Sequence, residues 1–146
     1  RLMSYVENGG TVVVQYNTQS RLGPLEGRVG PYPLEIGRGR VTDERAPMTL
    51  LVPDHALLTK PNRIDASDFD GWIQERGLYY ASTWDARYTP ILASADQGEE
   101  PLQGGLLFAR HGKGRYVFTG LAFFRQLPAG VPGAYRLFLN LIGAAR

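Results

Sequence analysis

The feature that most constrains the fold of this sequence is a short β-branched run, TVVVQY, at residues 11–16. It follows Gly9 and Gly10, and residues 2–6 before the two glycines have the pattern of the last turns of a helix. Glycine readily takes the left-handed backbone conformation that ends helices. A short β-branched run without alternation is typical of a strand that is covered on both faces. A helix, a glycine pair and a buried strand in this order predict an α/β fold with parallel strands.

The part of the chain after this strand predicts little regular structure. Residues 17–47 are rich in Gly, Pro and Arg, and we expect a long excursion with short edge strands near residues 34–36 and 40–42. The apolar run at residues 48–58 contains Pro53, which suits a short edge strand and a turn better than a central strand.

The middle of the chain gives stronger signals. Residues 65–77, DASDFDGWIQERG, predict a helix, because Ser67 and Asp70 stand at capping-box spacing and a glycine ends the segment. Strands are predicted at residues 78–84 and 88–95, where β-branched and aromatic residues are frequent.

The last third of the chain predicts a β-hairpin and a closing helix. Residues 105–123 contain two apolar runs that turn at Gly112 and Lys113. Apolar residues of the final segment repeat at helical spacing, namely Ala134, Leu137, Phe138, Leu141 and Ile142. We therefore expect a single α/β domain over residues 1–146, without an internal repeat.

Composition excludes several classes of function. The net charge is +2 and no stripe of Lys and Arg is interleaved with aromatic residues, so we expect no nucleic-acid partner. No apolar run approaches the ~18 residues of a membrane span, so we expect no membrane partner. The absence of Cys excludes thiol nucleophiles and disulfides. Because the sequence begins at Arg1 without Met, we interpret it as part of a longer protein, and the compartment stays open, with the periplasm and secretion among the choices.

Metal and phosphate sites are not predicted. His55 and His111 are the two histidines of the sequence, too few for a histidine-rich metal site. Residues 37–39 and 112–114 have the glycines of a phosphate-binding loop, but no helix is predicted after either, so both are interpreted as turns. We expect no cofactor and no metal.

Polar and aromatic residues around the predicted middle helix are candidates for a binding surface. The group includes Trp72, Arg76, Trp84 and Asp85. Tryptophan beside Arg and Asp is a combination that sugar-binding and peptide-binding surfaces use, because the ring stacks while the polar groups orient hydroxyls or carbonyls. Arg125, just after the last strand, faces the same crevice if the sheet is doubly wound. The alternative is that Trp72 is a core residue and Arg76 pairs with a nearby acid.

A hydrolase is an alternative that the sequence leaves open. Asp54 precedes His55 in a turn that contains a proline, and an Asp–His pair serves as a general base in enzymes. Two carboxylates within residues 65–85 are a second route to hydrolysis. A turn histidine bonded to the backbone and ordinary solvated acids explain the same residues without catalysis.

Three segments carry a resemblance to a known family, namely residues 2–18, 61–92 and 112–142. Together they resemble the C-terminal domain of long bacterial PIG-L (LmbE-like) deacetylases. That domain is similar to the trehalose-utilization (ThuA-like) proteins of the class I glutamine-amidotransferase-like superfamily. The resemblance implies a flavodoxin-like sheet with flanking helices, which would need further strands on the N-terminal side of Arg1.

The resemblance also implies that the superfamily's catalytic pair is missing. The Cys nucleophile of the superfamily follows a central strand, which here matches residues 12–16 and is followed by Asn17 and Thr18. Its His and Glu follow a late strand, which matches residues 116–121 and runs into the apolar residues 121–123. Deacetylation in the PIG-L family belongs to a separate zinc-binding domain, whose His and Asp motif is not found in this sequence.

We therefore expect a non-catalytic accessory domain of a PIG-L-type deacetylase, which packs on the deacetylase or presents a ligand crevice. The expected partners are the N-terminal deacetylase domain of the same chain, a carbohydrate and a second copy of the chain. A purely structural oligomerisation module is a further alternative. The residues expected to line the crevice are Asn17, Trp72, Arg76, Trp84, Asp85 and Arg125.

Overall fold

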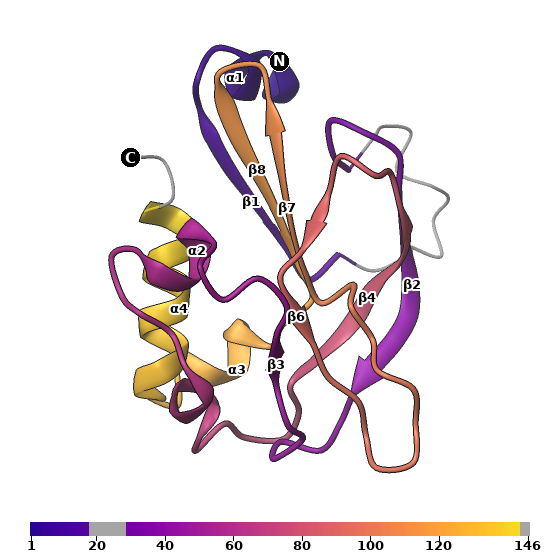
Figure 1. Cartoon of the computed structure of the whole chain (residues 1–146), viewed down its shortest axis with the longest axis vertical. Helices are drawn as coiled ribbons and strands as arrows, with labels where there is room; N and C mark the ends of the chain where they lie inside the picture. Colours follow the sequence, from indigo (N-terminus) through magenta and orange to yellow (C-terminus); the bar gives the residue numbers. More distant parts are fainter. Residues whose placement is uncertain (18–28, 144–146) are drawn as a thin grey trace.

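The main sheet of the domain has four strands and mixed direction (Figure 1). The computed structural model describes residues 1–17 and 29–143. The strands lie in the order β1 (Thr11–Gln15), β8 (Gly114–Thr119), β7 (Leu106–His111) and β5 (Thr89–Pro90). Strand β1 is parallel to β8, and the other pairs are antiparallel. The prediction of an α/β fold is confirmed, with parallel pairing limited to β1 and β8 within the described residues.

Two smaller antiparallel pairs extend the β structure. Strand β2 (Leu34–Val41) pairs with β4 (Gly77–Trp84), and β3 (Thr49–Leu50) pairs with β6 (Leu92–Ala93). The two short strands expected near 34–36 and 40–42 are thus one continuous strand, because the Gly- and Arg-rich middle of β2 passes through irregular pairing with β4 instead of leaving the sheet. The strand predicted at 88–95 is divided between β5 and β6.

Four helices and one 3-10 turn accompany the strands within the described residues. They are α1 (Leu2–Glu7), α2 (Ala56–Thr59), α3 (Phe123–Gln126) and α4 (Pro132–Gly143), with a 3-10 turn, η1 (Ala66–Phe69). Figure 1 shows α2, α3 and α4 together on the side of the molecule opposite the β2–β4 pair. Helix α4 contacts η1, α2, α3 and β1. The final helix and the β7–β8 hairpin were both predicted, and both predictions are confirmed.

Strand β1 separates two parts of the hydrophobic core. Val13 packs against the larger cluster, which includes Leu137 and Leu141 of α4. Val12 and Val14 pack against the second cluster on the opposite face. Both faces of β1 are therefore covered, as its β-branched sequence predicted, although β8 is its single strand neighbour within the described residues. Gly9, at φ +112°, ends α1 in the left-handed conformation before the strand begins.

The prediction of a helix at residues 65–77 is wrong, because the helical part of this segment is the single 3-10 turn η1. Asp65, and not Ser67, is the N-cap: its carboxylate accepts from the Ser67 amide, and Asp68 accepts from the Asp65 amide. Short Asp and Ser side chains bond to their own backbone and compete with helix propagation. Gly71, at φ +71°, then turns the chain away from the helical path.

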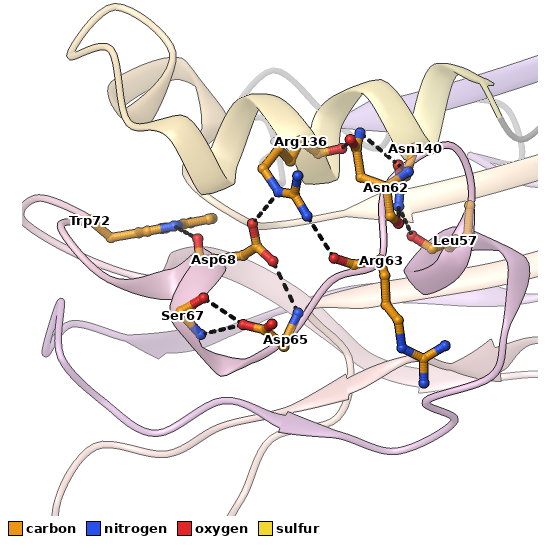
Figure 2. Close-up of polar contacts among 9 residues, drawn as sticks. All are labelled: Leu57, Asn62, Arg63, Asp65, Ser67, Asp68, Trp72, Arg136 and Asn140. Carbon is orange, nitrogen blue, oxygen red and sulfur yellow. Dashed lines mark hydrogen bonds and ion pairs between the residues drawn. The ribbon is translucent and has the colours of Figure 1, made fainter.

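A polar network fixes this segment to α4 (Figure 2). The fully buried Asn140 amide donates to the carbonyls of Leu57 and Asn62 and accepts from the Asn62 amide. Arg136 Nε donates to Asp68 Oδ1 at 2.7 Å, and its Nη2 donates to the Arg63 carbonyl. Every polar group at the centre of this network has a partner, which makes it a structural clamp between α4 and residues 57–72.

Candidate functional site

Backbone strain gathers at the carboxyl end of β1. Within the described residues, the non-glycine residues with positive φ are Tyr16 (44°), Gln74 (66°) and Tyr79 (55°). Such a conformation costs about 1–3 kcal/mol per residue and persists where the surrounding structure enforces it, often at functional sites. Tyr16 is the first residue after β1, and its ring contacts that of Tyr79 with centroids 5.5 Å apart. Two of the three strained residues therefore meet in space.

Three aromatic rings from three elements form a cluster there. The Tyr16 ring meets Tyr79 of β4 edge-on at 86°, and it meets Phe124 of α3 at 4.5 Å with a tilt of 58°. Tyr16 and Tyr79 are half-buried, and Phe124 is 44% exposed. The cluster of Tyr16, Tyr79 and Phe124 thus presents aromatic surface to solvent while its inner edges are packed.

A buried acid holds the arginine beside this cluster. Arg125 Nε donates to Glu75 Oε1, and its guanidinium lies 4.9 Å from the centre of the Phe124 ring. Glu75 is 8% exposed, whereas the Arg125 side chain is about one-third exposed. The orientation of Arg125 is therefore fixed by an ion pair on one side and an aromatic face on the other.

Gln126 locks the segment that carries Glu75. Its Oε1 accepts from the Ile73 amide at 2.8 Å, and its Nε2 donates to the carbonyls of Ile73 and Glu75. Gln126 is fully buried, so these bonds replace all contact with water. These hydrogen bonds hold Ile73 and Glu75, the residues on either side of Gln74, which explains how the unfavourable φ of Gln74 is maintained.

The electrostatics of the site suit binding better than nucleophilic attack. Burial, followed by the neighbouring Tyr79 and Glu75, raises the pKa of Tyr16 above its ordinary value, and Arg125 opposes this effect. The phenol is therefore protonated at neutral pH, where it is a hydrogen-bond donor and acceptor and a poor nucleophile. Asn17 follows directly, half-buried, with its Nδ2 donating to the Gln15 carbonyl at 3.2 Å.

The six residues predicted to line one crevice lie in three separate places. Asn17 and Arg125 flank the aromatic cluster at the end of β1. Trp72 is 3% exposed, its Nε1 donates to the Asp68 carbonyl at 3.0 Å, and its ring packs against Phe69 and Phe123. Trp72 therefore has the core position that the alternative interpretation gave it.

Arg76 is also a core residue. Its guanidinium donates to the carbonyls of Ala46 and Phe69 and lies 5.8 Å from the ring centres of Phe69 and Trp72. The sequence suggested a nearby acid as the partner of Arg76, but the hydrogen-bond acceptors in the structure are these carbonyl oxygens. Burial accordingly lowers the pKa of Arg76, and Tyr80 and the acids Asp43, Asp70 and Glu44 oppose this effect.

Trp84 and Asp85 lie at the far end of β4. Asp85 accepts from Arg87 Nε at 2.8 Å, and this hydrogen bond is the main reason that the pKa of Asp85 is lowered to about 2. Arg87 stacks over the Tyr32 ring at 3.7 Å. Asp85 is thus engaged in a surface ion pair, while Trp84 lines a separate pocket.

Asp54 and His55 have separate roles. The Asp54 side chain is 92% exposed and lies 3.8 Å from Arg63. His55 is the N-cap of α2, because its Nδ1 accepts from the Leu57 amide at 3.2 Å, and its ring packs against Phe108. Nδ1 is therefore an acceptor here and carries no N–H that could donate to the Asp54 carboxylate, as a carboxylate–histidine pair through this atom requires.

This cap predicts how stability depends on pH. Burial, with a smaller effect from Arg110, lowers the pKa of His55 below 6.5 in the folded state. The unfolded chain therefore takes up a proton first, so the stabilising effect of His55 is complete above pH 6.5 and is lost as the pH falls below it. His55→Asn keeps a capping acceptor that does not titrate. Urea unfolding between about pH 7.5 and 5 should show a smaller loss for this variant than for the wild type, and equal losses would contradict the role.

Neither a metal site nor a membrane helix is found in the described part of the chain. Over residues 1–17 and 29–143, no three His, Asp or Glu side chains gather in a group that could hold a metal ion. The helices within these ranges are also too short or too polar to cross a membrane.

Tyr16, Tyr79 and Phe124 were not among the predicted site residues. Tyr16 was assigned to the predicted strand at residues 12–16, whereas β1 ends at Gln15 in the structure, so Tyr16 is the first residue of the turn. Tyr79 and Phe124 carried no signal, because they belong to apolar runs that predict strand and core equally well.

Comparisons with known proteins extend to the fold alone. No protein-family model matches the chain, and no curated protein matches it. A cytoplasmic protein from Salmonella typhimurium is similar in structure, with 15% identity and a TM-score of 0.59 over 98% of this chain. The cold-adapted beta-galactosidase from Rahnella sp. R3 matches 97% of the chain at 16% identity and a TM-score of 0.49, over 20% of its own length. The chain spans 58% of the Salmonella protein, with which it shares an α/β fold.

Proposed function

We propose that this chain is a non-catalytic, ligand-binding α/β domain whose site lies at the carboxyl end of β1. The observation that carries the proposal is the cluster of Tyr16, Tyr79 and Phe124, in which two strained tyrosines and an exposed phenylalanine are held beside the Glu75–Arg125 ion pair. Strain that is maintained at a surface, next to a fixed charge pair, has no evident role in packing the core.

The proposed architecture is flavodoxin-like, of the glutamine-amidotransferase type. Its support is the sharp turn after β1, where Tyr16 has φ 44°, because this superfamily places its nucleophile on such a strained elbow. The resemblance matched the nucleophile position to Asn17 and Thr18, but β1 ends at Gln15, so Tyr16 is the first residue after the strand. Its phenol is protonated, and its raised pKa argues against nucleophilic attack. On this proposal the domain retains the strained turn after the strand but has no catalytic nucleophile there.

A carbohydrate is the ligand class that these groups suit. Aromatic faces stack on the apolar face of a sugar ring, and the amide of Asn17 and the guanidinium of Arg125 suit hydroxyl or carbonyl oxygens. Since Glu75 neutralises Arg125, the site has no uncompensated positive charge that would demand an anion. The resemblance to the deacetylase-associated domains supports an accessory role next to a PIG-L-type deacetylase, which acts on N-acetylated sugars.

Replacing Phe124 by alanine is the direct test. Its ring is the most exposed part of the cluster, so the loss of one stacking face should weaken the binding of a sugar by about tenfold with little effect on folding. Isothermal titration calorimetry with a panel of N-acetylated and neutral oligosaccharides measures the change.

Leu139→Ala is the matched control. Leu139 is 48% exposed on α4, outside the aromatic cluster, so its truncation removes a similar exposed apolar side chain and should leave affinity unchanged. Equal affinities for wild type and Phe124→Ala, or the absence of binding across the panel, would reject the proposed site.

A further inference from the structure

A pocket lies beside the second half of β4. It has a volume of about 410 Å³, and its lining includes Gly39, Tyr80, Ser82, Trp84, Leu102 and Gln103. Its residues on β4 are Tyr80, Ala81, Ser82 and Trp84, and Tyr79 is not among them. The pocket thus shares no residue with the cluster of Tyr16, Tyr79 and Phe124.

A break in the pairing of β2 with β4 shapes the floor of this pocket. Ile36 pairs with Ala81 and Gly39 with Tyr80, so two residues of β2 between these pairs have no counterpart on β4. Bulges of this kind recur beside binding sites. The absence of a side chain at Gly39 leaves space in the pocket, because a Cβ at this position would lie 3.3 Å from the Leu102 side chain.

The pocket is uncharged and amphipathic. None of its lining residues is Asp, Glu, Lys or Arg, and the polar side chains on it are neutral, including the Ser82 hydroxyl and the Gln103 amide. The loop that leads to it carries Glu99 and Glu100, which disfavour an anionic ligand. An indole beside neutral hydrogen-bonding groups matches a ring that has one apolar face and hydroxyls at its rim.

The backbone of β4 argues against an extended peptide as the ligand. Peptides that bind to sheets add a strand to a free edge. Here β4 is paired with β2 on one side, and its Ala81 amide donates to the Gly104 carbonyl on the other. At Ala81, which lines the pocket, β4 is thus bonded on both sides, so an added peptide strand cannot pair with this residue.

We propose that this pocket binds a neutral sugar unit, of the size of a mono- or disaccharide, stacked on Trp84. The volume lies within the range of ~300–1,000 Å³ that small-molecule sites span. This inference is independent of the site at the end of β1, since it uses other residues.

Intrinsic fluorescence tests the proposal with the two tryptophans of the chain. Trp72 is 3% exposed in the core, so a change in emission on adding maltose, N,N′-diacetylchitobiose or their monosaccharides reports on Trp84. Gly39→Leu is designed to fill the pocket without left-handed backbone strain, since the φ of Gly39 is not positive. We expect this variant to lower affinity by at least about tenfold.

Control variants separate this proposal from the function proposed above. Phe124→Ala should reduce binding at the end of β1 and leave the Trp84 response, whereas Gly39→Leu should do the reverse. Trp84→Phe keeps a stacking ring and should abolish the fluorescence change while calorimetry still detects binding. An unchanged response in Gly39→Leu, a response to glucuronic acid equal to that of the neutral sugars, or no response to any neutral sugar would each overturn the proposal.

Discussion

Replacing Asn140 by alanine is expected to lower the free energy of unfolding by about 3–5 kcal/mol. The Asn140 amide is fully buried and bonds to the Leu57 carbonyl at 2.9 Å, the Asn62 carbonyl at 2.7 Å and the Asn62 amide at 2.9 Å. Its removal leaves three backbone groups at the α4 interface without partners, and each unsatisfied buried group costs about 1–3 kcal/mol. That loss is a large part of the ~5–15 kcal/mol that stabilises a domain.

Urea unfolding followed by circular dichroism measures this change. Asn8→Ala is the matched control, because Asn8 is exposed and its side chain makes one bond, to the Ser4 carbonyl at 2.8 Å. We expect the control to lose less than about 1 kcal/mol. Similar losses for the two variants would show that the network in Figure 2 does not hold α4 to residues 57–72.

Replacing Arg76 by alanine is expected to cost about 3–4 kcal/mol of stability without a separate effect on ligand affinity. The side chain is 4% exposed and supplies the donors for the carbonyls of Ala46 and Phe69, so truncation leaves both oxygens unsatisfied and opens a cavity. The sequence predicted that Arg76 lines a ligand crevice. A structural role and a ligand-binding role predict different effects of this substitution.

A structural Arg76 shows its effect in unfolding, whereas a ligand-contacting Arg76 shows it in binding. Arg87→Ala is the control for stability, because Arg87 is an exposed arginine whose ion pair with Asp85 is solvated, and such pairs contribute little. If Arg76→Ala unfolds at the same urea concentration as wild type but binds sugar more weakly, then Arg76 reaches the ligand and the core assignment fails.

Elements defined by local signals could be predicted from the sequence. Gly9 and Gly112 have the left-handed φ that their positions at a helix end and a hairpin turn required. The spacing of Leu137 and Leu141 placed both in the core, and both are fully buried. In each case the information lies within a few neighbouring residues, so the pattern determines the structure.

The segment at residues 65–77 could not be predicted in this way. Asp65 and Asp68 bond to backbone amides within their own turn, and Trp72 donates to the Asp68 carbonyl from just beyond it. Arg136 donates to the Asp68 carboxylate from a distant position on α4. These contacts favour a single 3-10 turn over a helix, although the spacing of apolar residues alone suits a helix. Tertiary contacts therefore override the local pattern here.

The candidate site was predictable only in part, for a related reason. Arg125 could be placed near the sheet's carboxyl edge because it follows the last strand directly. The contact of Tyr16 with Tyr79 and Phe124 joins residues far apart in the sequence, and a positive φ at tyrosine has no signature in residue type. Trp72 and Trp84 are equally aromatic in the sequence, and only the fold decides that one is in the core and the other lines a pocket.

Chemical-shift mapping during a titration tests the central claim most directly. The titration uses the oligosaccharide of the panel that binds most tightly, in excess over the site at the carboxyl end of β1. We predict that the ring resonances of Tyr16, Tyr79 and Phe124 and the side-chain resonances of Arg125 shift together. The sugar itself should be recovered unchanged. Shifts confined to other parts of the molecule, or conversion of the sugar during the titration, would contradict a non-catalytic binding site at the carboxyl end of β1.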